Sequence, residues 1–165
     1  MMGKMELFHG SNREVRIPKI YIGRSPLDFG KGFYVTTSFT QAENWARRKT
    51  FRMAAGSPIV NVYDFPDNIV EQEHISVKQF LKADEEWLDF VVANRNEEYY
   101  NEKYDVVIGP VADDSVIRLI RMYMNGIYDK EEVIKRFKTE ILDNQILIAS
   151  EKASKFLVFK EARVV

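Results

Sequence analysis

The sequence predicts a single α+β domain, in which strands and helices contribute to one core without alternating regularly along the chain. Segments rich in β-branched and aromatic residues are separated by two, one or no segments of helical periodicity. The chain has 165 residues, 45% of them hydrophobic, which is enough to bury a core without disulfides or a metal. No internal repeat, low-complexity tract or linker divides it, so we expect one domain over residues 1–165.

Two strands and a helix are expected first. Residues 5–9 are mostly apolar and run into a glycine, as a strand that enters a turn does. After a loop rich in glycine and proline, residues 33–37 combine aromatic with β-branched side chains and predict a second strand. A helix should follow directly, capped by Ser38 or Thr40 and ending near Gly56.

The middle of the chain predicts a strand, a helix and another strand. Residues 59–65 alternate between apolar and polar side chains and end at a proline. Residues 87–92 then show helical spacing behind three acidic residues, which suit the positive end of a helix dipole. Residues 104–108 indicate a buried strand, which Gly109 and Pro110 should stop.

Two helices and two strands should complete the chain. Asp113 or Asp114 can cap the first helix, and the second should run from about residue 130 to 142. Residues 145–149 and 156–159 predict the last two strands, joined by a short turn.

Charge and residue types argue against several functions. Lys and Arg total 24 against 25 Asp and Glu, so the net charge of -1 provides no long-range attraction to nucleic acid or membrane. The absence of cysteine excludes disulfides, a thiolate nucleophile and cysteine-ligated metals. The two histidines form no zinc-binding pattern, so we expect no metal. No signal-peptide core and no run of 18 apolar residues is present, which predicts a cytoplasmic protein without a membrane partner.

Three short motifs remain as candidates for chemistry. The first, at the end of the first expected strand, is Leu7-Phe8-His9-Gly10-Ser11. The second, which leads into the next strand, is Phe29-Gly30-Lys31-Gly32-Phe33-Tyr34, and Trp45 follows it by eleven residues. The third, where a late strand begins, is Asn144-Gln145-Ile146. The glycines around Lys31 have neither the spacing nor the context of a nucleotide phosphate loop.

These motifs resemble segments of the ADP-ribosyltransferase superfamily, in particular its poly(ADP-ribose) polymerase and diphtheria-toxin branch. The first motif is similar to the family's histidine strand, and the second is similar to the segment that brings its first nicotinamide-stacking tyrosine. Trp45 stands where the family places its other stacking tyrosine, and Gln145 stands where it places its catalytic glutamate. A resemblance to small bacterial proteins of unassigned function, which are grouped with the transferase toxins, extends over most of the chain.

The resemblance implies NAD as co-substrate and a split mixed or antiparallel sheet with flanking helices. His9 would hydrogen-bond a ribose hydroxyl, and the backbone of Gly10 would receive the carboxamide, with Ser11 beside it. Tyr34 and Trp45 would stack on the two faces of the nicotinamide ring, which suits a planar cation.

At the two ends of this pocket, Lys31 would lie near the pyrophosphate and Gln145 would bond the ribose 2'-hydroxyl. An amide carries no negative charge to stabilise an oxocarbenium-like transition state, a loss of about 3 to 4 kcal/mol by analogy with other oriented groups.

Several interpretations follow. The first is a mono-ADP-ribosyltransferase, a bacterial toxin or effector that modifies a macromolecule and is neutralised by an antitoxin protein. The second is a non-catalytic module that binds NAD or ADP-ribose, and the third is an interaction protein without a ligand. An RNA 2'-phosphotransferase, which shares the fold, has little support from the near-neutral charge.

Each candidate residue also has a purely structural explanation. His9 can be a strand histidine bonded to backbone, Tyr34 and Trp45 can be core aromatics, and Gln145 can be a polar residue at a strand start. The basic run of Arg47, Arg48, Lys49 and Arg52 is either a solvated helix face or a phosphate contact.

Overall fold

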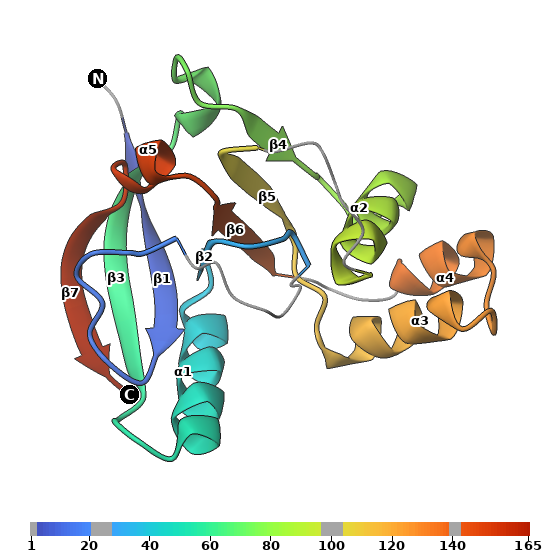
Figure 1. Ribbon diagram of the computed structural model, residues 1–165, viewed down its shortest axis with the longest axis horizontal. Helices are drawn as coiled ribbons and strands as arrows, with labels where there is room; N and C mark the ends of the chain where they lie inside the picture. Colours follow the sequence, from blue (N-terminus) through green and yellow to red (C-terminus); the bar gives the residue numbers. More distant parts are fainter. Residues whose placement is uncertain (1–2, 21–27, 97–103, 139–142) are drawn as a thin grey trace.

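The computed structural model describes residues 3–20, 28–96, 104–138 and 143–165, and it is organised around a seven-stranded sheet (Figure 1). The strands are β1 (Lys4–Ser11), β2 (Phe33–Thr36), β3 (Ile59–Pro66), β4 (Val77–Gln79), β5 (Val106–Pro110), β6 (Asn144–Ile148) and β7 (Val158–Val164). Their order in the sheet is β4-β5-β6-β2-β1-β3-β7. The β4–β5 pair is parallel and the other pairs are antiparallel, which confirms the predicted α+β class and its mixed sheet.

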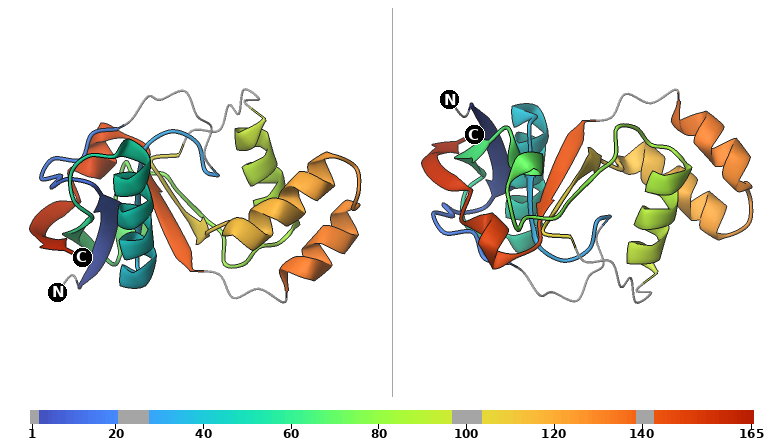
Figure 2. Two further views of the ribbon diagram at one scale, coloured as in Figure 1. Left: turned by 90° about the horizontal axis from the view of Figure 1, so that it is seen from below. Right: turned by 90° about the horizontal axis from the view of Figure 1, so that it is seen from above.

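The helices are α1 (Phe39–Met53), α2 (Glu85–Arg95), α3 (Asp114–Met124), α4 (Lys130–Phe137), the one-turn α5 (Glu151–Ser154) and a 3-10 turn at Ile69–Glu71. Figure 2 shows α1 beside the half of the sheet that contains β1, and α2, α3 and α4 grouped together beside the other half. Ser38 and Asp113 cap α1 and α3 by accepting backbone N–H groups of Gln41 and Val116. In both cases the first of the two predicted capping residues is the one used.

Two apolar clusters lie on opposite faces of the sheet. Strand side chains alternate, so Leu7, Phe33 and Val35 face one cluster, which also contains Tyr63 and Ile146. Tyr34 and Leu147 face the other, which contains the buried side chains of α2, α3 and α4. Within that second cluster the indole of Trp87 is fully buried and donates a hydrogen bond to the carbonyl oxygen of Pro110 at 3.0 Å.

The two halves of the sheet meet at a narrow junction. β1 pairs with β3 along its whole length, from Lys4 to Ser11, whereas β1 and β2 pair at the single position of Phe8 and Thr36. Beyond that position the two strands are free to diverge. The residues predicted to be functional in the first two motifs lie beside this junction.

Two local predictions need correction, and one strand was missed. β5 continues through Gly109 to Pro110, where it still pairs with β6. On its other edge, β4 pairs only with residues 106–108, so no neighbouring strand there requires the N–H group that proline lacks. The turn expected before the last strand is the helix α5, capped by Ser150, and β7 runs to Val164. The short strand β4 was not predicted. The end of the fourth expected helix, at residues 139–142, lies outside the described residues.

Gly10 sets how closely α1 approaches β1. A Cβ atom at Gly10 would lie 2.0 Å from the carbonyl oxygen of Ala42 and 2.7 Å from the backbone nitrogen of Ala46. Both alanines are completely buried, and neither contact atom belongs to a side chain that can move away. The helix that carries Trp45 therefore lies directly on the strand that carries His9.

Within the described residues, no helix is long and apolar enough to cross a membrane.

Gly10→Ala should therefore destabilise the fold by about 3 kcal/mol or more, because α1 has to move off β1. Urea unfolding followed by circular dichroism measures this loss. Gly3→Ala is the matched control, since its Cβ would meet only the end of the exposed, movable Asp67 side chain. Equal midpoints for both variants would contradict the close packing at Gly10.

Candidate functional site

The first two predicted motifs meet through a hydrogen bond. The His9 Nδ1 atom lies 2.7 Å from the carbonyl oxygen of Tyr34, although the two residues are 25 positions apart. The imidazole also stacks on the Phe33 ring, with 4.1 Å between ring centroids and 27° between planes. The His9-Gly10 and Phe33-Tyr34 segments are thus in direct contact at the β1–β2 junction.

This geometry defines the protonation state of His9. A carbonyl oxygen only accepts hydrogen bonds, so Nδ1 must carry the proton that it donates to Tyr34. Burial lowers the pKa of His9 to about 4, against the weaker opposing effect of the Tyr34 carbonyl, so the ring is neutral near pH 7. The Nε2 atom then carries a lone pair and acts as an acceptor. Such a ring can receive a hydroxyl group.

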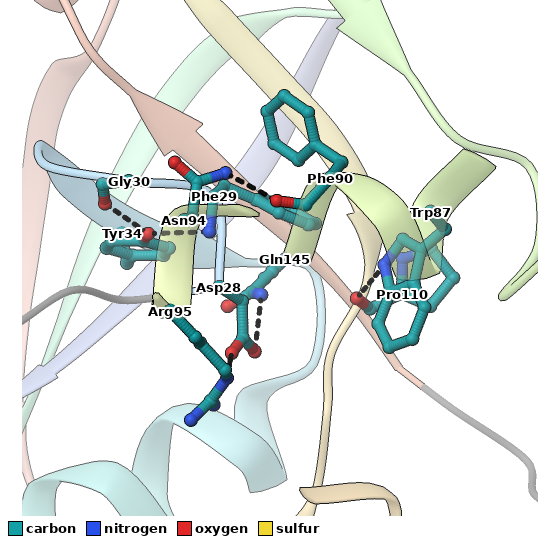
Figure 3. A network of polar contacts seen from close by, with 10 residues as sticks. All are labelled: Asp28, Phe29, Gly30, Tyr34, Trp87, Phe90, Asn94, Arg95, Pro110 and Gln145. Atoms are coloured by element: carbon teal, nitrogen blue, oxygen red, sulfur yellow. Dashed lines mark hydrogen bonds and ion pairs between the residues drawn. The ribbon is translucent and has the colours of Figure 1, made fainter. Parts of the chain in front are cut away.

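The Tyr34 hydroxyl closes the loop that precedes β2 (Figure 3). It donates to the carbonyl oxygen of Gly30 at 2.5 Å and accepts from the backbone N–H of Phe29 at 3.1 Å. Burial raises the pKa of this phenol, with the Phe29 hydrogen bond acting in the opposite direction, so it stays protonated. Gly30 has a φ of 96°, a conformation that favours glycine. The loop is consequently held around the Tyr34 ring.

Gln145 belongs to a buried polar network that joins three elements. Its Nε2 atom lies 3.4 Å from Asp28 Oδ2, and the other oxygen of Asp28 accepts from Arg95 Nε at 2.7 Å (Figure 3). Asp28 and Gln145 are 8% and 4% exposed. The network therefore ties the loop before β2 to β6 and to the end of α2.

The carboxylate of Asp28 fixes the orientation of the Gln145 amide. Because a carboxylate accepts, it selects the NH₂ end of the amide, and the carbonyl Oε1 of Gln145 must point away from Asp28. The negative charge that the sequence lacks at position 145 is thus present one side chain away, where it is paired with the Arg95 guanidinium. Asp28 and Arg95 were not predicted, since a lone loop aspartate and an arginine in a last helical turn carry no distinctive sequence signal.

The site residues lie on both faces of the sheet. Thr36 is opposite Gln145 and Tyr34 is opposite Leu147 in the β2–β6 register, so the Tyr34 and Gln145 side chains leave the sheet on one face. His9 stacks on Phe33 and leaves β1 on the other face. A ligand that contacts all three side chains must therefore reach both faces at the narrow β1–β2 junction.

The other predicted residues surround the junction less closely. Trp45 is half-buried on α1, and no stacking contact joins its ring to that of Tyr34 in the part of the chain described. Ser11 is fully buried, and its hydroxyl accepts from Lys49 Nζ at 3.4 Å. Lys31 is exposed. The structure brings His9, Gly10, Tyr34 and Ser11 to one junction but does not preassemble an aromatic sandwich.

Among the described residues, we searched for a metal site and for grooves that could hold a ligand. No cluster of three or more His, Asp or Glu side chains suited to a metal ion occurs among the described residues. Two open grooves, of about 540 and 210 Å³, are lined by residues of α4 and by residues near the start of β1, respectively. Neither groove is lined by a predicted site residue.

Comparison with known proteins identifies the family. The family model described as "Protein of unknown function (DUF3990)" matches residues 5–159, so the chain belongs to this family. No curated protein and no solved structure matches the chain. The match covers all three candidate motifs, and its description assigns no activity to them.

The low pKa of His9 should make the fold sensitive to acid. A histidine whose folded-state pKa lies below its unfolded value stabilises the fold above the unfolded pKa and loses that contribution as the pH falls toward the folded pKa. As the pH falls from 6.5 to 4, the free energy of unfolding of the wild-type protein should therefore drop by up to about 3 kcal/mol more than that of His9→Gln, which has no ring to protonate. Urea titrations across this range measure the difference; parallel curves would show that the ring is solvated.

The Asp28 carboxylate should also make a glutamate at position 145 unfavourable. Gln145→Glu places a second carboxylate beside Asp28 and should lower the unfolding free energy at pH 7.5 by about 1 to 3 kcal/mol. Repulsion raises the pKa of one of the two carboxyls, so this loss should shrink at pH 4.5, where that carboxyl is protonated.

Adding Asp28→Asn to Gln145→Glu leaves one carboxylate for Arg95 and should recover most of the stability. Gln79→Glu, at an exposed strand position, is the control for the change of charge alone. The network is refuted if Gln145→Glu is as stable as Gln79→Glu at pH 7.5.

Proposed function

We propose that this protein binds NAD at the β1–β2 junction and acts as a mono-ADP-ribosyltransferase. The observation that carries the proposal is the hydrogen bond from His9 Nδ1 to the Tyr34 carbonyl oxygen. It unites the two motifs on which the family resemblance depends, and it leaves His9 Nε2 as an acceptor for a ribose hydroxyl. A charged imidazolium would have no such acceptor, and the lowered pKa of His9 avoids that state near pH 7.

The remaining groups suit cleavage of the nicotinamide glycosidic bond. This cleavage passes through an oxocarbenium-like state, so a site must orient the ribose and hold the leaving ring. In the proposal, Tyr34 and Trp45 contact the two faces of nicotinamide, Gly10 receives the carboxamide through its backbone, and Ser11 lies beside them. The Oε1 atom of Gln145, which points away from Asp28, accepts the 2'-hydroxyl of the ribose, because Asp28 already holds the amide nitrogen.

A non-catalytic NAD or ADP-ribose module is the second candidate. It is favoured by the neutral amide at position 145 and by the pairing of the nearby Asp28 charge with Arg95. Both features reduce the negative potential available to an oxocarbenium ion. The two candidates share one binding site and differ in turnover, so NAD binding and nicotinamide release must be measured separately.

The biological setting follows from the same resemblance. The transferase candidate is a bacterial toxin or effector with a macromolecular acceptor, such as a protein or a nucleic acid, and an antitoxin protein neutralises it. Its donor, NAD, fits the cytoplasmic location expected from the sequence. No metal is required for this reaction in the proposal.

Calorimetry with NAD, together with an assay for released nicotinamide, tests the proposal. We expect wild-type protein to bind NAD and His9→Ala to bind it about tenfold more weakly, the effect of one lost hydrogen bond. Trp45→Phe should retain binding better than Trp45→Ala, because it keeps an aromatic face. Slow nicotinamide release from the bound state would favour the transferase, and binding without release would favour the module.

His74→Asn serves as the control for His9→Ala. His74 is exposed and has a φ of 64°, which asparagine tolerates, so this variant should bind NAD as the wild type does. If the wild-type protein neither binds millimolar NAD nor releases nicotinamide from it, both candidates are wrong and the interaction protein remains.

A further inference from the structure

The cations of α1 and the loop after β1 divide into two groups with different surroundings. Arg47 is paired with Glu43 at 2.9 Å, and Arg48 is paired with Asp114 at 3.6 Å. Lys49 instead reaches the end of β1, where its Nζ atom lies 3.4 Å from the hydroxyl oxygen of Ser11. Arg47 and Arg48 are thus paired with carboxylates of α1 and α3, whereas Lys49 faces the strand that carries His9.

Lys49 shares its surroundings with two further cations. Its pKa is lowered by burial and then by the positive charges of Arg13 and Arg52. Across the described residues, none of these three cations forms an ion pair with an aspartate or glutamate. We call Arg13, Lys49 and Arg52 the basic cluster.

Hydrogen bonds hold the two chain segments of the basic cluster together. The Asn12 side chain donates to the carbonyl oxygen of Ala55 at 3.1 Å, and Ser57 donates its N–H to the carbonyl oxygen of Asn12 at 3.2 Å. The buried Asn61 side chain donates to the carbonyl oxygen of Arg13 at 3.1 Å. The end of β1 is thereby held against the residues that follow α1, so the backbone segments that carry Arg13 and Arg52 lie side by side.

The helix dipole accounts for only part of this arrangement. Arg52 lies in the last turn of α1, where a cation is stabilised by about 0.3 to 1 kcal/mol. Arg13 comes from a different segment of the chain. Lys49 is half-buried and contacts Ser11, which follows His9 by two residues on β1. Three mutually repelling cations without a carboxylate are what an anion-binding surface provides.

We propose that the basic cluster binds the pyrophosphate of the dinucleotide whose ribose His9 receives. This assignment rests on the proposed function. His9 and Ser11 are two residues apart on β1, so their side chains leave the strand on the same face, and Lys49 contacts Ser11 there. In NAD both riboses are joined to the pyrophosphate through their 5'-carbons. Whichever ribose lies at His9, the phosphates are therefore the next groups along the ligand.

The assignment displaces Lys31, which the sequence suggested for the same role. Lys31 is exposed on the loop before β2, on the Tyr34 side of the junction. The basic cluster combines three charges at the His9 side, enough to compensate the two negative charges of a pyrophosphate diester. The two assignments make different predictions for single-site variants.

Calorimetric titration with ADP-ribose, nicotinamide and a short single-stranded RNA, at two salt concentrations, tests the inference. Arg13→Ala/Arg52→Ala should weaken ADP-ribose binding at least about tenfold and reduce its dependence on salt, while the affinity for nicotinamide stays unchanged. Lys31→Ala should change ADP-ribose affinity less than twofold. Arg47→Ala/Arg48→Ala is the control for a loss of two positive charges from α1, and it too should bind as the wild type does.

The outcomes separate this inference from the proposed function. If ADP-ribose affinity depends on His9 but not on Arg13 and Arg52, the pyrophosphate assignment is wrong and NAD binding stands. If the double variant loses only RNA binding, the basic cluster belongs to a nucleic-acid acceptor and the inference is also wrong. If wild-type protein binds neither NAD nor ADP-ribose, the proposed function itself fails, and the pyrophosphate assignment fails with it.

Discussion

The hydrogen bond between His9 Nδ1 and the Tyr34 carbonyl oxygen is the contact on which the arrangement of the site depends. β1 and β2 pair at one position, so this bond is a second connection between the two halves of the sheet. It also determines which nitrogen of His9 carries the proton. The contact that joins the two strands thus leaves Nε2 of the same ring as an acceptor, so in the proposed function both the junction and ribose recognition depend on one side chain.

The other consequence of this architecture is the distribution of charge. Positive charge collects at the His9 side of the junction, in the basic cluster, whereas the buried carboxylate of Asp28 lies at the Gln145 side. Asp28 is nearly neutralised by Arg95. The surface is therefore better equipped to hold anionic groups than to stabilise a cation that develops on a ribose. For the proposed function, this asymmetry makes binding of the dinucleotide and its cleavage two separate questions.

Much of the fold follows from local signals in the sequence. Ser38 and Asp113 act as helix caps because their side chains satisfy free backbone N–H groups, and such signals are readable within four residues. The strand β4 escaped prediction because its three residues are too few to show alternation, and the parallel β4–β5 pairing depends on distant residues. Pro110 was expected to end its strand because proline lacks the N–H group that a paired strand uses. The residues of β5 do not show that one of its edges is free at this position.

The candidate site also contains residues that could be predicted from the sequence and residues that could not. His9, Tyr34 and Gln145 are predicted from the resemblance of their motifs to those of the ADP-ribosyltransferase superfamily, and the His9–Tyr34 contact brings two of those motifs together. Asp28 and Arg95 could not be predicted, because their importance comes from a pairing across 67 residues that no periodicity records. Similarly, the surroundings of the basic run on α1 could not be predicted, because Arg48 pairs with Asp114 of α3 and Lys49 lies near Arg13, and both partners are distant in sequence.

In the proposed function, His9 receives a ribose hydroxyl of NAD through Nε2. Nitrogen-15 NMR of the histidine side chains, recorded at neutral pH with and without NAD, tests this most directly. We expect a neutral His9 ring protonated on Nδ1, whose Nε2 resonance shifts on adding NAD while the Nδ1 resonance stays nearly constant. A His9 ring that is protonated on Nε2, or one whose resonances do not respond to saturating NAD, would show that Nε2 does not receive the ribose.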